Sequence, residues 1–477
     1  MSGVFGENPF PEHVATPEDT MSDTQISMHM EDDISTAIPN LGPAKVRSRM
    51  ECALFINEDQ RVQLFVTNEE GETGTNGTKT YDFEPAGPRG NLYFDPPKTK
   101  CAIVTCGGLC PGINDVIRAL VMTAHHSYGV ASTLGIRYGL QGFIPSYGHQ
   151  LVELTPDKVA SIHEFGGTIL SSSRGPQSPE EIVDALERMN VSVLFLIGGD
   201  GTMQATLVIQ EEVAKRGLKL SVIGIPKTID NDINFVPRSF GFDTAVEKAT
   251  ESIRCAHTEA LGAPNGIGMV KLMGRESGFI AAQATLALKD VNFVLIPEDS
   301  FEIHGPNGFL QALDDRIRRR GHAVVVVAEG AGQDLLAASS QTDASGNPVL
   351  RDICGLLRRE IDSYFKSKDM DYTLKFIDPS YIIRSVPANA NDRVYCGFLG
   401  QNAVHAAMAG KTGMVVSKLH GHYIHLPLSL VAGKRKKINT VSNYWQAVLQ
   451  STGQPVHMKT PPTDYPQGAT CKLDFQS

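Results

Sequence analysis

Short apolar runs alternate with amphipathic helical patterns from residue 100 onward, and this alternation limits the possible folds more than any other feature of the chain. Buried strands are expected at residues 101–105, 130–136, 192–197 and 220–225, and helices at residues 114–124, 179–189 and 203–215. After residue 232 the pattern resumes, with helices expected at residues 244–261, 279–288 and 308–320 and strands at residues 266–271, 291–296 and 323–327. Strands and helices in succession predict mostly parallel sheets covered on both faces. The fold class is therefore α/β, with a second α/β layer after residue 232.

The two ends of the chain and one internal stretch break this pattern. Residues 1–45 are rich in Met, Ser, Thr, Pro and acidic residues, which predicts disorder or a loosely docked tail. Residues 50–97 hold short β-like pieces at 52–56 and 61–67, and this extension packs either beside the core or between subunits. Residues 336–348 are polar and contain glycine, which is typical of a surface loop. The remaining expectations are a helix over 392–409, a strand over 413–416 and an irregular tail after 453.

Length and composition exclude several classes of protein. At 477 residues the chain is too long for one typical core, so two domains with an extension are expected. A formal net charge of −10 argues against broad nucleic-acid binding and provides no general attraction for an anionic substrate. The sequence shows neither a secretory pattern nor an apolar run near the roughly 20 residues of a membrane span, so we expect a cytoplasmic protein with no membrane partner. Its eight cysteines are scattered, which is typical of reduced thiols.

Residues 226–232, Pro-Lys-Thr-Ile-Asp-Asn-Asp, directly follow the apolar run 220–225. Open α/β sheets bind ligands at the carboxyl ends of their strands, so two carboxylates, a hydroxyl and an ammonium at this place indicate a site. An ordinary turn is the alternative interpretation, because Asp and Asn are common turn residues.

Residues 198–202, Gly-Gly-Asp-Gly-Thr, lie in the same way between an apolar run and a helical pattern. Glycines let backbone N–H groups approach phosphate oxygens, and a helix N-terminus favours negative charge. Asp200 would hold the Mg²⁺ that accompanies such phosphates. NAD kinases and lipid kinases have similar loops, but a NAD kinase would not explain residues 226–232.

Together with residues 273–278, Met-Gly-Arg-Glu-Ser-Gly, these two stretches make the chain resemble the 6-phosphofructokinase family, and most closely its long plant and trypanosome forms. The resemblance implies two Rossmann-like parallel-sheet domains with the active site in the cleft between them. It divides the chain into an extension (1–97), a nucleotide-binding domain (98–240, completed by 385–453), a sugar-phosphate-binding domain (241–384) and a tail (454–477).

The resemblance assigns catalysis to residues 227–232. Asp230 would be the general base, Thr228 would hydrogen-bond the transferring phosphoryl group or the sugar, and Lys227 would neutralise phosphate charge. Asp232 would orient the site or assist magnesium, although a helix N-cap is an equally good interpretation of that residue.

Donor binding is implied for glycine loops, an arginine and a helix start, namely Gly107, Gly108, Arg174, Gly175, Gly199, Asp200, Gly201 and Thr202. The planar fork of Arg174 could pair two phosphate oxygens at once, whereas the residues alone favour a solvated loop arginine. The implied donor is ATP with Mg²⁺, and the implied metal ligand is Asp200.

Acceptor binding is implied for Thr228, Ile229, Asp230, Met273, Gly274, Arg275, Glu329, Tyr381, Ile382, Ile383 and Arg384. Arg275 and Arg384 would meet the existing phosphate, and Glu329 would accept hydrogen bonds from sugar hydroxyls. A glutamate at the end of a buried strand is costly to desolvate without such a partner. Arg393 either joins this set or forms a surface salt bridge with Asp392, and we favour the salt bridge.

Three positions depart from the family pattern. Gly266 stands where short bacterial members carry an arginine donated across a subunit interface, and Leu140 stands where an aromatic residue often flanks the nucleotide. The pyrophosphate-dependent branch pairs a lysine at the position of Lys227 with an aspartate at that of Gly201. Glycine there leaves space for the α-phosphate of ATP, which favours ATP as the donor.

The sequence therefore predicts ATP-dependent phosphorylation of fructose 6-phosphate at its 1-hydroxyl group, the committing step of glycolysis. The resemblance also implies a homo-oligomer, a tetramer. A pyrophosphate-dependent phosphotransferase is the main alternative. A catalytically inactive regulatory subunit is a second alternative, and the presence of Asp200, Asp230 and Arg384 argues against it.

Overall fold

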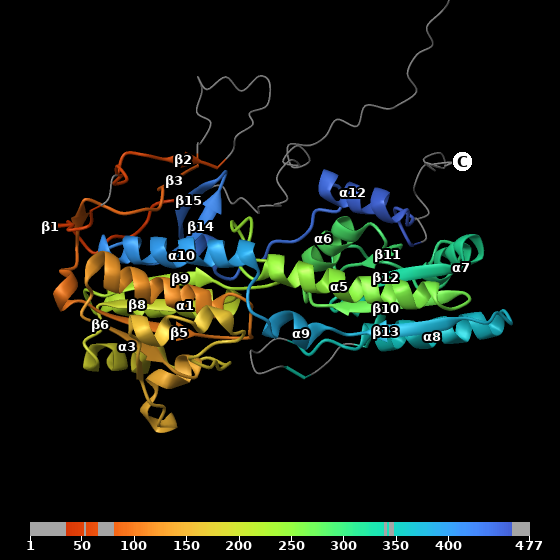
Figure 1. Ribbon diagram of the computed structural model, residues 1–477, viewed down its shortest axis with the longest axis horizontal. Helices are drawn as coiled ribbons and strands as arrows, with labels where there is room; N and C mark the ends of the chain where they lie inside the picture. Colours follow the sequence, from red (N-terminus) through yellow and green to blue (C-terminus); the bar gives the residue numbers. More distant parts are fainter. Residues whose placement is uncertain (1–34, 52–53, 65–80, 338–340, 343–347, 460–477) are drawn as a thin grey trace, which may run out of the picture.

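The computed structural model describes residues 35–51, 54–64, 81–337, 341–342 and 348–459. Figure 1 shows an elongated molecule in which a larger and a smaller sheet lie end to end, each with helices packed on it. The predicted α/β class is confirmed. Within the described ranges, no helix is both long and apolar enough to cross a membrane.

The larger sheet has seven strands in the order β15-β14-β9-β8-β5-β6-β7. Its strands are β5 (Lys100–Thr105), β6 (Ser132–Ile136), β7 (Val152–Glu153), β8 (Val193–Gly198), β9 (Ser221–Pro226), β14 (Met414–Leu419) and β15 (His422–Pro427). Neighbours from β14 to β6 run parallel, whereas the edge strands β7 and β15 are antiparallel to theirs. The predicted parallel strands are confirmed, and the antiparallel edge β15 is an element that the sequence analysis missed.

Helices cover both faces of this sheet because its strands are apolar on both faces. The helices are α1 (Ile113–Met122, continued by the π-helical segment η2, Thr123–Tyr128), α3 (Pro179–Arg188), α4 (Asp200–Lys215) and α10 (Ala390–Met408). Side chains alternate along each strand. Ile103 and Phe195 therefore pack in one cluster with α1 and α10, while Val104 and Leu196 pack on the other face with α3 and α4.

The smaller sheet has four parallel strands in the order β11-β12-β10-β13. The strands are β10 (Gly266–Leu272), β11 (Phe293–Leu295), β12 (His322–Ala328) and β13 (Thr373–Ile377). The helices are α5 (Phe242–Leu261), α6 (Phe279–Leu288), α7 (Phe309–Arg320) and α8 (Ile353–Ser367). α7 and α8 cover one face, and α5 and α6 cover the other, where one hydrophobic cluster continues into the core of the larger sheet. The two sheets therefore share part of a core.

The end of the chain is divided between the two sheets. The resemblance implies that residues 385–453 belong with the first sheet, and β14 and β15 lie in that sheet. The last helix, α12 (Asn443–Thr452), instead packs against α6, because Trp445 is buried in the cluster that contains α6. Gln454 continues this attachment, since its side chain hydrogen-bonds both the N–H and the carbonyl of Val294 on β11.

Short elements connect the larger ones. They are η1 (Pro96–Lys98), η3 (Gly139–Phe143), η4 (Pro145–Tyr147), α2 (Pro156–Val159), η5 (Ile162–Glu164), η6 (Gln333–Leu335), α9 (Ser380–Ser385) and α11 (Leu428–Val431). The surface loop expected at 336–348 lies partly outside the described residues. The described cysteines (Cys101, Cys106, Cys110, Cys255, Cys354 and Cys396) are free thiols.

The N-terminal extension packs beside the larger sheet, which is one of the two arrangements expected from the sequence. It forms two small antiparallel pairs, β1 (Val46–Arg47) with β4 (Asn91–Leu92) and β2 (Val62–Gln63) with β3 (Asp82–Phe83). Backbone hydrogen bonds join Glu84 and Ala86 to β15. The strand expected at 52–56 is wrong for residues 54–56, which are irregular, while residues 52–53 and 1–34 lie outside the described chain.

A salt bridge and a partly buried hydrogen bond reinforce this attachment. The Glu84 carboxylate lies 2.9 Å from Lys411 Nζ and 3.4 Å from His425 Nδ1, and both partners belong to the core. Burial opposes ionisation of Glu84, but the hydrogen bonds from His425 and Lys411 lower its pKa to about 2. The extension is thus held by a salt bridge and a side-chain hydrogen bond as well as by backbone pairing.

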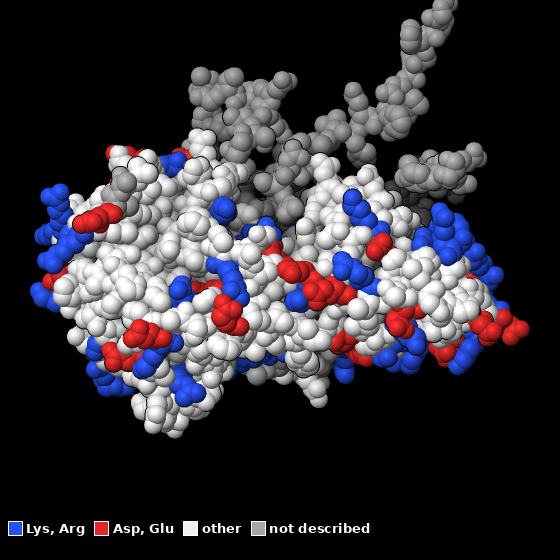
Figure 2. Space-filling view, viewed as in Figure 1, with Lys and Arg blue, Asp and Glu red and all other residues white. Residues whose placement is uncertain are grey.

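Charged side chains of both signs are interspersed on the face shown in Figure 2. With a net charge of −10, the molecule provides no overall positive field that would draw in a phosphorylated substrate. Local cationic groups must provide that attraction.

Candidate active site

The carboxyl ends of parallel strands from both sheets open onto one cavity of about 750 Å³. β5, β8 and β9 contribute from the larger sheet, and β10 and β12 from the smaller one, as expected for ligand sites of open α/β sheets. Most of the site residues expected from the sequence line this cavity: Gly107, Gly108, Arg174, Gly175, Gly199, Asp200, Gly201, Thr202, Lys227, Thr228, Ile229, Asp230, Asp232, Met273, Arg275, Glu329 and Arg384.

The turn after β9 brings two carboxylates to the cavity. The Thr228 hydroxyl donates to Asp232 Oδ1 at 3.1 Å and accepts from the Asp230 N–H at 3.1 Å, which fixes both acidic residues. Asn231 adopts a left-handed backbone conformation (φ 55°), and its side-chain oxygen accepts from the Ser239 N–H. Asp230 Oδ1 is buried without a hydrogen-bond partner among the described residues. This oxygen therefore has an unused acceptor position on a residue that lines the cavity.

Electrostatic surroundings raise the pKa of these carboxyl groups. Burial raises the pKa of Asp230 well above its usual value, and the nearby Asp232 and Glu329 carboxylates add to the effect. Arg435 and Lys227 oppose it. Burial likewise raises the pKa of Glu329. A carboxyl group with a raised pKa is suited to accept a proton near neutral pH.

The first turn of α4 faces the cavity. Helix α4 begins at Asp200, so the first backbone N–H groups of the helix have no partner within it and can bind an anion. A Cβ atom at Gly201 would meet no described atom within 4 Å, so glycine leaves space open at this point. Asp200 Oδ1 accepts from the Gly433 N–H at 2.8 Å, and Oδ2 accepts from Gln204 Nε2 at 3.0 Å.

A buried cation from the turn after β9 contacts the loop after β5. Lys227 is 5% exposed, and its ammonium donates to the Gly108 carbonyl. Burial lowers the pKa of Lys227. The Gly107 N–H and carbonyl bond to the backbone of Ser173 and the hydroxyl of Ser172, which joins this loop to the segment that presents Arg174.

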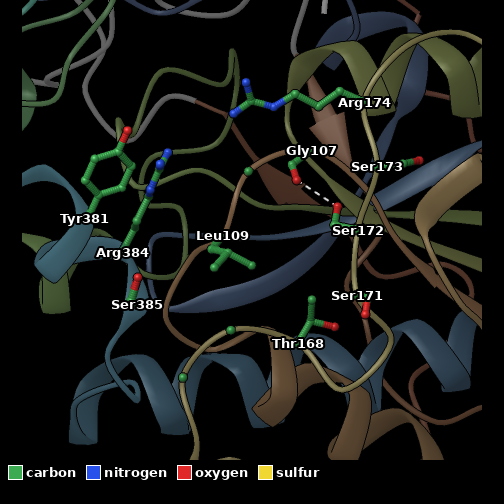
Figure 3. A pocket seen from close by; sticks show the side chains of 13 residues that line it. Gly107, Leu109, Thr168, Ser171, Ser172, Ser173, Arg174, Tyr381, Arg384 and Ser385 are labelled. Carbon is green, nitrogen blue, oxygen red and sulfur yellow. Dashed lines mark hydrogen bonds between the residues drawn. The ribbon is translucent and has the colours of Figure 1, made fainter. Parts of the chain in front are cut away.

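A second cavity of about 680 Å³ adjoins the first and shares Gly107, Gly108, Arg174 and Arg384 with it. Figure 3 shows Tyr381 and Arg384 of α9 on one side and the loop of residues 171–174 on the other. The Arg384 guanidinium lies 4.7 Å from the centre of the Tyr381 ring. The two cavities form one cleft between the sheets.

Several expected site residues do not line either cavity. Ile382 is exposed, Ile383 is fully buried in the core, and Gly274 bonds through its carbonyl to the Gly330 N–H. The helical geometry of α9 explains why Ile383 does not reach the cavity. Tyr381 and Arg384 are three residues apart and lie on the same side of the helix, whereas Ile383 points away from that side.

The expected pairing of Arg393 with Asp392 is wrong. Asp392 is buried and accepts from the N–H and hydroxyl of Thr244. Arg393 instead contacts Glu164 at 3.3 Å and the Ala388 carbonyl. Adjacent helical residues point in different directions, so they do not face each other.

Arg435 is a cavity residue that the sequence analysis missed. Its guanidinium lies 2.8 Å from Glu276, 3.7 Å from Asp200 and 4.0 Å from Asp232. Among the described residues, no cluster of three or more His, Cys, Asp or Glu side chains is arranged to hold a metal ion.

Comparison with known proteins decides the family. The family model described as phosphofructokinase matches residues 100–407. The chain is 50% identical over 414 residues to the ATP-dependent 6-phosphofructokinase of Borreliella burgdorferi, a match that covers 85% of this chain and 92% of that protein. The chain belongs to the phosphofructokinase family.

Other phosphofructokinases support the resemblance to long forms. ATP-dependent 6-phosphofructokinase 1 of Arabidopsis thaliana is 46% identical, with 85% of each chain covered. The ATP-dependent 6-phosphofructokinase of Trypanosoma brucei brucei is 45% identical over 77% of this chain and 76% of that protein. Among solved structures, a pyrophosphate-dependent phosphofructokinase from Marinobacter aquaeolei has a TM-score of 0.61 at 21% identity, over 77% of this chain and 94% of that one, which supports the phosphofructokinase fold.

The structure gives a physical reason for one departure from the phosphofructokinase pattern. Gly266 is the first residue of β10 and lies against the last turn of α5. A Cβ atom at this residue would overlap the Ala260 carbonyl. Glycine is therefore required by the packing of α5 on β10. Leu140, a second departure, lines the cavity.

Proposed function

We propose that this protein transfers the γ-phosphoryl group of ATP to the 1-hydroxyl of fructose 6-phosphate and releases fructose 1,6-bisphosphate and ADP. The observation that carries the proposal is the Asp230 carboxyl group, which lines the cleft together with the N-terminus of α4 and a group of arginines and has one oxygen without a hydrogen-bond partner among the described residues. The relatives named ATP-dependent 6-phosphofructokinase support it independently.

The donor would lie on the larger sheet. The free N–H groups at the start of α4 and the loop at Gly107 and Gly108 would contact its phosphates. Lys227 and Arg174 would neutralise phosphate charge. The open space at Gly201 would accommodate the α-phosphate, which favours ATP over pyrophosphate.

The acceptor would lie against the smaller sheet. Arg275 and Arg384 would bind its 6-phosphate, and Glu329 would accept hydrogen bonds from its hydroxyl groups. Asp230 would take the proton of the 1-hydroxyl while the resulting oxygen attacks the γ-phosphorus and the bond to the leaving ADP oxygen breaks. Each of these groups belongs to the lining of one cavity, so the two substrates would meet there.

The carboxylates of the cleft suit Mg²⁺. This ion prefers oxygen ligands and commonly takes one or two carboxylates together with substrate phosphates. Asp200, with Asp232 beside it, offers such oxygens, and each carboxylate oxygen retains a lone pair beyond its present hydrogen bond. Bound Mg²⁺ would neutralise charge that develops on the phosphates.

The deciding experiment compares kcat/KM for fructose 6-phosphate phosphorylation with MgATP and with magnesium pyrophosphate. A strong preference for MgATP is expected. Preference for pyrophosphate would establish the alternative donor, because it would mean that Lys227 outweighs the space at Gly201. Activity with neither donor would indicate a catalytically inactive regulatory subunit.

The homo-oligomeric state, a tetramer, and the cytoplasmic location are also proposals. Analytical ultracentrifugation of the full chain tests the first, and fractionation of the source cells tests the second.

A further inference from the structure

Residues 433–438, Gly-Lys-Arg-Lys-Lys-Ile, form a segment that contacts two acidic residues of the cleft, Asp200 and Asp232. The Gly433 N–H donates to Asp200 Oδ1 at 2.8 Å, and the Lys436 N–H donates to the Asp232 carbonyl at 2.8 Å. Between them, Arg435 forms a β-bridge with Ile233. The backbone of this segment is therefore fixed against both turns that carry acidic site residues.

Lys436 anchors the segment from its other side. Its side chain is 1% exposed, and its ammonium donates to the carbonyls of Val236 at 2.9 Å and Pro237 at 3.1 Å. The same ammonium lies 4.9 Å from the centre of the Phe279 ring. Because Lys436 points into the core, the preceding residue of this extended segment points the opposite way, into the cavity.

Arg435 bridges the cleft. Its Nη1 lies 2.8 Å from Glu276 Oε1, and Glu276 stands beside Arg275 on the loop after β10 of the smaller sheet. Its Nε lies 3.7 Å from Asp200 Oδ2, which belongs to the larger sheet. Asp200 and Glu276 therefore face one guanidinium from opposite sides of the cleft.

We propose that Arg435 is a positioning residue of the active site that holds the Asp200 carboxylate and the loop of Arg275 and Glu276 at a fixed distance from each other across the cleft. The planar guanidinium can serve two carboxylates in different directions, whereas a lysine ammonium on a flexible stem cannot hold both in place. The proposal rests on the proposed function, since it concerns the alignment of its donor and acceptor.

The test uses four variants of the full chain. Arg435→Met removes the bridge, Arg435→Lys keeps the charge, Glu276→Gln releases only the acceptor side, and Lys437→Met is the matched control because this exposed side chain of the same basic run does not line the cavity. For each, KM and kcat are measured for both substrates, and equilibrium binding of MgADP and of fructose 6-phosphate is measured by calorimetry.

Arg435→Met is expected to raise both KM values and both dissociation constants by about 10- to 100-fold, the range for a lost hydrogen bond to a charged group. Arg435→Lys is expected to restore the KM and the dissociation constant of only one of the two substrates. Glu276→Gln is expected to weaken the binding of fructose 6-phosphate and to leave the binding of MgADP unchanged. Lys437→Met is expected to match the wild type in both measurements.

Two results would overturn the proposal. The first is an Arg435→Met enzyme with both KM values and both dissociation constants within twofold of the wild type. The second is a loss of melting temperature in Arg435→Met that accounts for a uniform fall in activity and that Arg435→Lys does not relieve. A wild-type protein without activity would instead refute the proposed function, and the two binding measurements would still decide the role of Arg435.

Discussion

Introducing an aspartate at residue 201 tests the physical basis of donor choice. Gly201 is the second residue of α4, and a Cβ atom there would project into open space at the cavity. Gly201→Asp would therefore direct a carboxylate towards the space where the phosphates of ATP are proposed to lie, and its Cβ atom would meet no described atom within 4 Å.

The magnitude follows from the distance between the new charge and a donor phosphate. Two like charges about 4 Å apart repel by about 1 kcal/mol in water and by about 4 kcal/mol at an effective dielectric constant near 20. Each 1.4 kcal/mol changes an equilibrium or rate constant tenfold, so kcat/KM for MgATP should fall by about 5-fold to 1,000-fold. Because the site also loses water when substrates bind, we expect a fall of at least about tenfold.

Stability should not account for this loss. A glycine within a helix costs roughly 0.5–1 kcal/mol relative to alanine, and an acidic residue in the first turn gains about 0.3–1 kcal/mol from the helix dipole. The melting temperature of Gly201→Asp measured without ligands should therefore equal or exceed that of the wild type.

Two control variants separate charge from bulk in a coupled assay of fructose 6-phosphate phosphorylation. Gly201→Asn has the size of aspartate without its charge, and Gly201→Ala adds only a methyl group. We expect the order wild type, Ala, Asn, Asp in falling kcat/KM for MgATP. A Gly201→Asp enzyme that retains wild-type kcat/KM within twofold would refute the reasoning, and an equal fall for Asn and Asp would show that bulk alone excludes the donor.

Three further predictions concern the base, the core and the extension. Asp230→Asn should lower kcat by at least about 100-fold while the KM values change little, as loss of a general base does, and steady-state kinetics would measure this. Gly266→Ala should destabilise the fold by about 1–3 kcal/mol, because the new methyl group overlaps the Ala260 carbonyl; urea unfolding tests it against the wild type. The Glu84 pKa of about 2 lies below its usual 4.5, so its contribution to stability is complete above pH 4.5 and is lost as the pH falls towards 2. In Glu84→Gln the melting temperature should fall at pH 7, and the gap to the wild type should narrow with acid; a constant gap would contradict the assignment.

Most of the fold could be predicted because most of its helices and strands have a hydrophobic pattern that is visible within a short stretch of sequence. Alternating apolar runs and helical patterns placed β5, β6 and the strands from β8 to β12 within a few residues, whereas the short edge strand β7 was missed. The missed helix α8 carries the same signal, with Asp352 as its N-cap and buried residues at 353, 357, 361 and 365. The missed β15 could not be found in this way, since its antiparallel pairing with β14 depends on a turn and on the extension that covers it.

The site residues that directly follow a strand could be predicted from the sequence. Those that only the tertiary fold brings into the cleft could not. The turns after β8 and β9 lie next to each other because β8 and β9 are neighbours in the sheet, so two local motifs were enough to indicate one site. Arg435 lies in a run of basic residues that alone indicates a solvated surface. Only the burial of Lys436 on the other side of that segment directs Arg435 into the cleft.

Glycine at residue 330 shows how the acceptor side of the cleft depends on contacts that no local pattern reveals. A Cβ atom there would overlap the Arg275 carbonyl, so glycine alone permits the loops after β10 and β12 to lie this close. The Gly330 N–H then bonds the Gly274 carbonyl, and the Glu329 N–H bonds the Leu272 carbonyl. These bonds bring Glu329 and Arg275, far apart in the sequence, to the same cavity. The missing side chain, rather than a polar group, is therefore what unites the residues proposed to bind the sugar phosphate.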